Sequence, residues 1–165
     1  MPPLDLKRLL EVLHGAEVQF LLVGGVAGIA HGMNYLTTDL DVCYQRTKKN
    51  YSAIVSALRP GKPWLRTKDG EIPFLFDEKT IESGLNFTFT TDWGDIDLLG
   101  EVPGVGTFEN MLPNSEEFEF YGMPVKTVSL EDLIKAKHAA GRPKDKVHLL
   151  ELEAIREILK GQGPK

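Results

Sequence analysis

An alternation of aspartate with aliphatic residues occurs twice in this 165-residue sequence and constrains its folding most strongly. Residues 39–42 read Asp-Leu-Asp-Val, and residues 95–98 read Asp-Ile-Asp-Leu. Successive side chains of a β-strand point to opposite faces, so each segment would bury its aliphatic residues and present two carboxylates on the other face. Two such strands side by side would bring three or four carboxylates into one small volume, because paired strands lie about 4.8 Å apart.

Carboxylates that gather in this way repel one another, and each raises the pKa of its neighbours. A divalent cation removes that cost, and Mg²⁺ or Mn²⁺ prefers hard oxygen ligands of this kind. The pattern therefore predicts a metal site. The alternative is that each aspartate caps a turn or faces water at a strand end.

Two glycines, Gly24 and Gly25, stand between an apolar run and a short predicted helix over 26–31. Glycine lets the backbone N–H groups approach a ligand closely, and a helix N-terminus favours an anion. We expect a phosphate group here. A tight strand-to-helix turn with nothing bound is the alternative.

Basic residues gather near the C-terminal end, with Lys135 and Lys137 on a helix predicted to begin at Ser129. Arg142 and Lys144 open the next helix. Cations at such a junction would hold a triphosphate or a leaving pyrophosphate, although a solvated charged surface has the same composition.

Asp145 follows Lys144 directly in the sequence. Its carboxylate would either orient that lysine or act as a favourable acid in the first turn of a helix.

The spacing of the apolar residues, and the glycines and prolines between the apolar segments, predict an α/β (α+β) fold, in which helices pack on a mixed β-sheet. We expect a single domain over 1–165, with a core of about 18–128 and a C-terminal helical part of about 129–161. Residues 60–84 carry no clear pattern. The predicted helices span 4–14, 26–31, 50–58, 129–140 and the segment from 142 onward, and the predicted strands span 18–23, 40–44, 85–90, 95–99, 116–121 and 124–128.

Composition narrows the function classes. The net charge of −5 and the pI of about 5.4 argue against a protein that wraps a nucleic-acid duplex. The chain has no apolar run of membrane-spanning length and no signal peptide at Met1–Asp5, so we expect no membrane partner. Cys43 is the single cysteine and forms no internal disulfide, which favours a cytoplasmic location.

Taken in order, these motifs resemble the minimal nucleotidyltransferases of the DNA polymerase β-like superfamily, and among them most closely the AbiEii-type toxin nucleotidyltransferases. The resemblance covers roughly 18–155. It is carried by Gly-Gly-Val-Ala at 24–27, His-Gly at 31–32, Thr-Asp-Leu-Asp at 38–41, Ile-Asp-Leu-Leu at 96–99, Pro-Gly at 103–104, Leu-Glu-Asp-Leu-Ile-x-x-Lys at 130–137 and Gly-Arg-Pro-Lys-Asp at 141–145.

The resemblance implies that Asp39 and Asp41 bind two catalytic metal ions and that Asp97 completes the triad. It also implies that Gly24 and Gly25 contact the nucleotide phosphates. The C-terminal motif would contact the nucleotide or orient the site; its residues are Lys137, Arg142, Lys144 and Asp145.

The implied reaction moves a nucleoside monophosphate from an NTP to an acceptor hydroxyl, with Mg²⁺ or Mn²⁺ bound and pyrophosphate released. The acceptor would be an RNA such as tRNA, a protein or a small molecule, and an antitoxin or other protein would be a partner. Two alternatives remain. One is a catalytically degenerate nucleotide-binding module or toxin–antitoxin component, which Val26 and His148 suggest because they depart from the family pattern. The other is an acidic metal-binding protein that binds no nucleotide.

Overall fold

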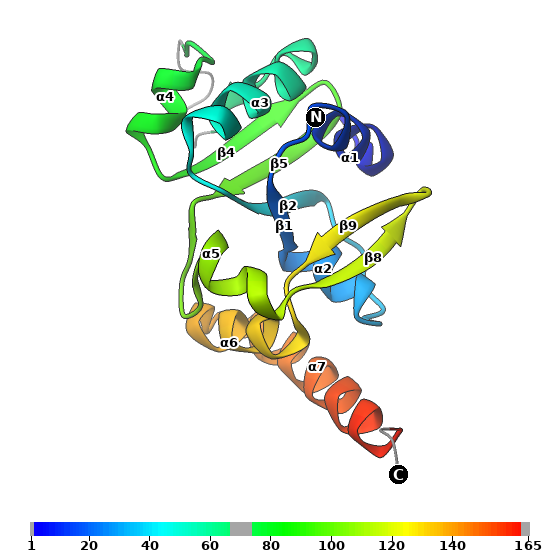
Figure 1. Ribbon diagram of the computed structural model, residues 1–165. Coiled ribbons are helices and arrows are strands. Elements are labelled where there is room, and N and C mark those ends of the chain that lie inside the picture. Colours follow the sequence, from blue (N-terminus) through cyan, green and yellow to red (C-terminus); the bar gives the residue numbers. More distant parts are fainter. Residues whose placement is uncertain (1, 67–73, 163–165) are drawn as a thin grey trace.

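A seven-stranded mixed sheet forms the centre of the protein in a computed structural model, which describes residues 2–66 and 74–162 (Figure 1). The strands lie side by side in the order β3-β4-β5-β2-β1-β9-β8. They are β1 (Phe20–Val23), β2 (Asp39–Tyr44), β3 (Trp64–Leu65), β4 (Asn86–Thr91), β5 (Gly94–Leu99), β8 (Glu116–Phe120) and β9 (Met123–Thr127).

Strand β2 lies in the middle of the sheet and pairs antiparallel with β1 and parallel with β5. In the register of β2 and β5, Asp39 lies opposite Asp95 and Asp41 opposite Asp97. Strands β4 and β5 form a hairpin, and β8 and β9 form another that joins the sheet through β1. The fold class expected from the sequence, a mixed sheet with helices packed on it, is confirmed.

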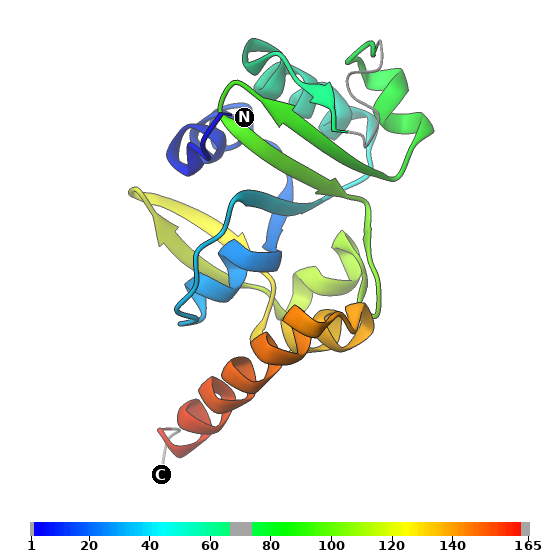
Figure 2. The ribbon, with the colours of Figure 1, turned by 180° about the vertical axis from the view of Figure 1, so that it is seen from behind.

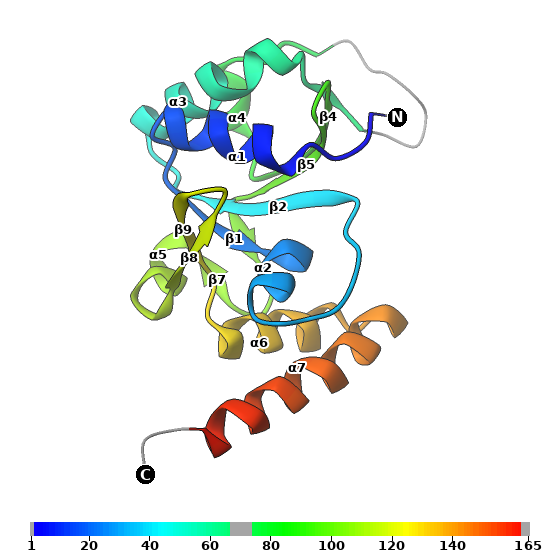
Figure 3. The ribbon, with the colours of Figure 1, turned by 90° about the vertical axis from the view of Figure 1, so that its right-hand side faces the viewer.

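The helices lie on both sides of this sheet. Figure 3 shows α1 and α3 on one side and α2 and α6 on the other, while Figure 2 shows α7 extending away from the body with the C-terminus at its end. The helices are α1 (Leu6–Gly15), α2 (Gly24–Ala30), α3 (Lys48–Leu58), α4 (Glu78–Ser83), α5 (Phe108–Met111), α6 (Leu130–Ala140) and α7 (Pro143–Gly161). No helix among the described residues is long and apolar enough to cross a membrane.

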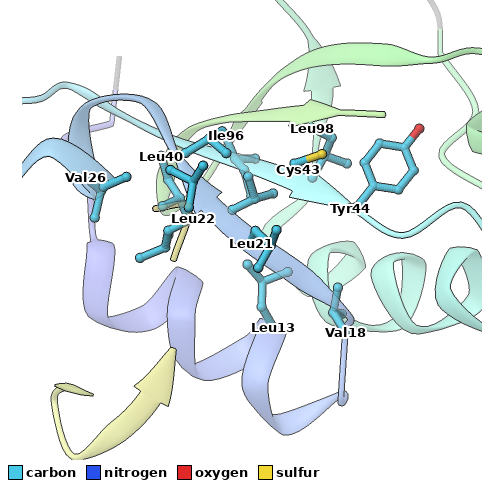
Figure 4. Close-up of a cluster of buried hydrophobic side chains, with 14 of the residues drawn as sticks. Leu13, Val18, Leu21, Leu22, Val26, Leu40, Cys43, Tyr44, Ile96 and Leu98 are labelled. Atoms are coloured by element: carbon cyan, nitrogen blue, oxygen red, sulfur yellow. The ribbon is translucent and has the colours of Figure 1, made fainter. Parts of the chain in front are cut away.

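The hydrophobic core explains why the two acidic strands keep their orientation. Leu40 and Val42 of β2 and Ile96 and Leu98 of β5 are fully buried, whereas the aspartates between them are only partly buried. Leu13 of α1 packs into the same cluster (Figure 4). A slip of one residue in either strand would exchange the faces, so burial of these aliphatic side chains sets the direction of the carboxylates.

The structure differs from the sequence-based expectation in four places, one of which is α5, a helix in a stretch where none was expected. The helix expected over 26–31 already begins at Gly24, because the two glycines form its first turn rather than a separate loop. The expected loop over 100–106 contains a short hairpin of β6 (Glu101–Val102) and β7 (Gly106–Thr107). The unassigned stretch over 60–84 includes β3 and α4, and its residues 67–73 lie outside the described residues.

Candidate functional site

Three aspartate carboxylates meet at one end of the central strands. Asp39 and Asp41 lie on β2, and Asp97 lies opposite Asp41 on β5. One carboxylate oxygen from each residue lies within 4.8 Å of the other two. The parallel register brings the three together, because residues 39 and 41 share the face of the sheet on which residue 97 lies.

The electrostatics of this cluster are unfavourable without a cation. Burial raises the pKa of Asp41 to about 8, and the negative charges of Asp39 and Asp97 act in the same direction, while a backbone hydrogen bond from Gly25 opposes them. Burial and Asp97 also raise the pKa of Asp39, against the opposing effect of Arg66. A set of oxygen ligands that holds excess negative charge fits Mg²⁺ or Mn²⁺.

The fourth aspartate of the two motifs does not join the cluster. Asp95 Oδ2 lies 2.9 Å from Arg66 Nη1, and Asp95 Oδ1 accepts a hydrogen bond of 2.8 Å from Thr90 Oγ1. Arg66 Nη2 also lies 2.5 Å from Asp97 Oδ1. Of the three or four carboxylates that the sequence allowed, three therefore form the cluster and one pairs with an arginine.

Gly24 allows the strand-to-helix turn to lie directly against the cluster. Its φ angle is +63°, and a Cβ atom at this position would overlap the Asp41 carboxylate. A Cβ atom on Gly25 would in turn overlap the Tyr35 hydroxyl. A larger residue at position 24 would therefore both strain the backbone and displace Asp41, the carboxyl whose pKa is raised to about 8.

Asp145 organises the basic side of the site. Its carboxylate is fully buried and lies 3.3 Å from Lys137 Nζ and 2.6 Å from Arg142 Nε, and it also accepts the Arg142 backbone N–H. Burial raises the pKa of Asp145, but the hydrogen bonds from Arg142 and Lys137 outweigh it and bring the pKa to about 2. Of the two roles open from the sequence, orienting Lys144 is not the one observed, since the contacts of Asp145 go to Lys137 and Arg142.

His148 holds the other side of Lys137. Its Nδ1 atom lies 3.2 Å from Lys137 Nζ, and its ring packs at a tilt against Tyr35, with 4.8 Å between the ring centroids. Burial and the nearby Lys137 charge lower the pKa of His148. A neutral imidazole with its proton on Nε2 accepts a hydrogen bond from the Lys137 ammonium at Nδ1, so Asp145 and His148 together direct Lys137.

A cavity of about 500 Å³ joins the acidic and basic sides. Its volume falls in the range of about 300–1,000 Å³ that is common for small-ligand sites. Apolar residues of the β6–β7 hairpin and of α6, such as Val102, Val105 and Leu133, line the rest of the cavity. All nine site residues proposed from the sequence line it, namely Gly24, Gly25, Asp39, Asp41, Asp97, Lys137, Arg142, Lys144 and Asp145.

Sequence reasoning missed two residues of the site. Arg66 directly follows β3, an edge strand of two residues in a stretch without periodicity, and Tyr35 lies in a loop. Neither belongs to a motif, and an isolated arginine or tyrosine in a loop-rich stretch carries no positional signal. His148 was visible only as a departure from a family pattern.

The fold is similar to that of solved nucleotidyltransferases. The lincosamide antibiotic adenylyltransferase LnuA, in a lincomycin-bound crystal structure, matches with a TM-score of 0.61 and 13% sequence identity over 93% of this chain and 99% of that chain. A Thermotoga maritima protein assigned to the nucleotidyltransferases, TM1012, matches with a TM-score of 0.57 and 14% identity over 94% of this chain and 91% of that chain. Comparison of the sequence with family models and with curated proteins found no match.

Proposed function

We propose that this chain, which has the fold of LnuA and TM1012, is a metal-dependent nucleotidyltransferase. It transfers a nucleoside monophosphate from an NTP to an acceptor hydroxyl and releases pyrophosphate. The observation that carries this proposal is the meeting of the Asp39, Asp41 and Asp97 carboxylates in a cavity that Gly24 and the cationic side chains of Lys137 and Arg142 also line. The acidic side suits a divalent metal and the cationic side suits a triphosphate.

The three aspartates would hold Mg²⁺ or Mn²⁺ as catalytic metal ligands. When bound, the metal lowers the pKa of the acceptor hydroxyl and neutralises charge on the leaving pyrophosphate. We assign to the Asp97 carboxylate the role of accepting, or orienting, the proton of the attacking hydroxyl.

The nucleotide would be bound by the rest of the cavity. Gly24 and Gly25 present their backbone to the phosphates, and Lys137, Arg142 and Lys144 supply positive charge. The Lys137 ammonium is already directed by two partners, so little conformational entropy is lost when it binds a phosphate.

The acceptor is proposed as a class, a hydroxyl of a small molecule, an RNA such as tRNA, or a protein. Because the LnuA structure is lincomycin-bound, a small molecule is the first class to test. We also propose that the chain belongs to the AbiEii-type toxin nucleotidyltransferases, that an antitoxin is its partner and that it acts in the cytoplasm.

One contact favours a second candidate function. The Arg66 guanidinium lies on Asp97 and already occupies one oxygen of this carboxylate. A protein that binds the nucleotide without turnover, either as a degenerate module or as a toxin–antitoxin component, would tolerate such pairing. Binding and transfer must therefore be measured separately.

The test is incubation of the protein with α-labelled NTPs and Mg²⁺, with hydroxyl-bearing small molecules, total RNA and cell-extract proteins offered as acceptors. We expect label transfer that is lost in Asp97→Asn and kept in Asp92→Asn, a matched change at the exposed turn between β4 and β5. NTP binding by calorimetry without transfer to any acceptor would support the second function. Thermal stability that neither Mg²⁺ nor NTP raises would contradict both.

A further inference from the structure

Arg66, which directly follows the edge strand β3, contacts the carboxylate cluster. Its Nη2 atom lies 2.5 Å from Asp97 Oδ1 and its Nη1 atom 2.9 Å from Asp95 Oδ2, so one guanidinium joins the two aspartates of β5. The side chain of Arg66 is 28% exposed, and the described residues that line the cavity do not include it. Because Arg66 directly follows β3, its guanidinium reaches Asp97 from the β3–β4 side of β5, opposite to β2.

Neighbouring strands fix the position of this arginine. The Arg66 backbone N–H donates to the Thr88 carbonyl at 2.9 Å, and the Thr88 hydroxyl donates to the Arg66 carbonyl at 3.2 Å. On the far side, Asp95 is held by Thr90 Oγ1 at 2.8 Å. Contacts thus run continuously from Thr90 through Asp95 and Arg66 to Asp97.

We propose that Arg66 is a positioning residue for Asp97 and that Asp95 serves to hold Arg66, an inference that rests on the proposed function. An arginine that holds one carboxylate oxygen fixes the plane of the carboxylate, and with it the direction of the second oxygen. The positive charge also offsets part of the repulsion among the clustered acids. The two aspartates of the second Asp-x-Asp motif therefore have different roles: Asp97 is a metal ligand, and Asp95 holds Arg66.

The opposite role, competition with the metal for Asp97, fits the geometry less well. Among the described residues, both ion pairs of the Arg66 guanidinium go to the aspartates of β5, Asp95 and Asp97, rather than to Asp39 or Asp41 of β2. Its Nη1 atom also bonds Asp95 and reaches the Phe89 carbonyl at 3.4 Å, so the guanidinium has partners besides Asp97 that oppose its release. The two roles predict opposite changes in metal affinity.

The experiment measures Mn²⁺ affinity of the full chain by calorimetry, with thermal unfolding as a check of folding. Loss of a residue that orients a metal ligand costs about 10- to 100-fold in affinity, and we expect this loss in Arg66→Ala. Arg66→Lys should recover part of it, because lysine keeps the charge but not the two-pronged geometry. The control is Arg156→Ala, which removes an arginine of α7 that forms an ion pair with Glu131. This variant should bind Mn²⁺ as the wild type does.

A double-mutant cycle tests the part assigned to Asp95. If Asp95 acts through Arg66, Asp95→Asn weakens Mn²⁺ binding less than Arg66→Ala, and the double variant binds no more weakly than Arg66→Ala alone. Additive losses would overturn this link. If Arg66→Ala unfolds, Arg66→Gln takes its place in the cycle, since it keeps a hydrogen-bond donor without the charge.

The outcomes separate this inference from the proposed function. Unchanged or tighter Mn²⁺ binding in Arg66→Ala, with wild-type binding intact, overturns the positioning role alone. A wild-type protein that does not bind Mn²⁺ overturns the proposed function and this inference together. With an acceptor in hand, the positioning role further predicts a fall in kcat at nearly unchanged KM for the NTP, because Arg66 lies apart from the basic residues of the cavity.

Discussion

Asp41 and Asp97 lie directly opposite each other on the parallel strands β2 and β5, with their carboxylates on the same face of the sheet. The pairing is unfavourable in itself, since burial and the neighbouring charges raise the pKa of Asp41 to about 8. Burial of the aliphatic residues between the aspartates holds the acids together before a ligand arrives. The free energy gained by burying these aliphatic residues thus offsets the repulsion between the acids, and the protein is less stable than it would be without the cluster.

Replacing Asp41 with asparagine should separate stability from metal binding. At pH 7.5 Asp41 is largely protonated in the folded state but ionised in the unfolded state, so a permanently neutral asparagine should stabilise the metal-free protein by on the order of 1–3 kcal/mol. The same variant should lose the Mg²⁺-dependent rise in Tm. Thermal unfolding in EDTA and in Mg²⁺ checks both effects, with the exposed Asp92→Asn as control. A lower Tm of Asp41→Asn in EDTA would contradict the account.

The response to Mg²⁺ should depend on pH. The Asp41 carboxyl has a pKa of about 8 in the folded protein against an ordinary 3.8. Folding therefore favours the protonated carboxyl, and the stability of the metal-free protein is highest below pH 3.8 and falls as the pH rises through 8. Mg²⁺ binds the deprotonated form. At a fixed subsaturating Mg²⁺ concentration, the rise in Tm should therefore grow from pH 6 to pH 8.5, with an affinity gain approaching about tenfold per pH unit below the pKa. An equal rise in Tm at both pH values would count against the assignment.

Gly24→Ala should damage the site as well as the backbone. Its φ angle of +63° disfavours alanine, and the added Cβ atom would overlap the Asp41 carboxylate. The matched control is Gly122→Ala in the β8–β9 turn, where φ is +82° and no atom lies within 4 Å of a new Cβ. We expect a loss of about 1–3 kcal/mol from backbone strain in both, and a loss of Mg²⁺ response in Gly24→Ala alone. Thermal unfolding with and without Mg²⁺ measures the difference.

Lys137 and Lys135 allow a comparison of two lysines on the same helix. The Lys137 side chain is 11% exposed and lines the cavity, whereas the Lys135 side chain is 64% exposed and lies near Asp132. Lys137→Met should weaken binding of a non-hydrolysable NTP by roughly 10- to 100-fold, the worth of one hydrogen bond to a charged group. Lys135→Met should change it less than about twofold. Calorimetry gives both values, and equal effects would place the triphosphate elsewhere.

Much of the candidate site was predictable because its residues obey local rules. The two Asp-x-Asp segments alternate with a period of two, and this periodicity alone predicts strands with an acidic face. Ser129 begins α6 as its N-cap, and its hydroxyl accepts the Asp132 backbone N–H at 3.1 Å. Rules of this kind act within a few residues, so a single sequence reveals them.

The contacts of Asp95 and Asp145 were not predictable from local rules. The sequence permitted Asp95 to join the metal cluster, but its partner Arg66 comes from the end of β3, on the far side of α4 and β4 in the chain. Asp145 stands beside Lys144 in the sequence, yet it contacts Lys137 from the preceding helix. Such partners depend on how distant segments pack, which no short pattern encodes.

The sequence by itself determined which residues are candidates for the chemistry and which face of each strand they occupy, because side-chain alternation and helix capping are properties of neighbouring residues. Only the tertiary structure decided which of the four aspartates share a volume and which one pairs with Arg66. The parallel register of β2 and β5 and the edge position of β3 set these contacts, and both arise from long-range burial of aliphatic side chains.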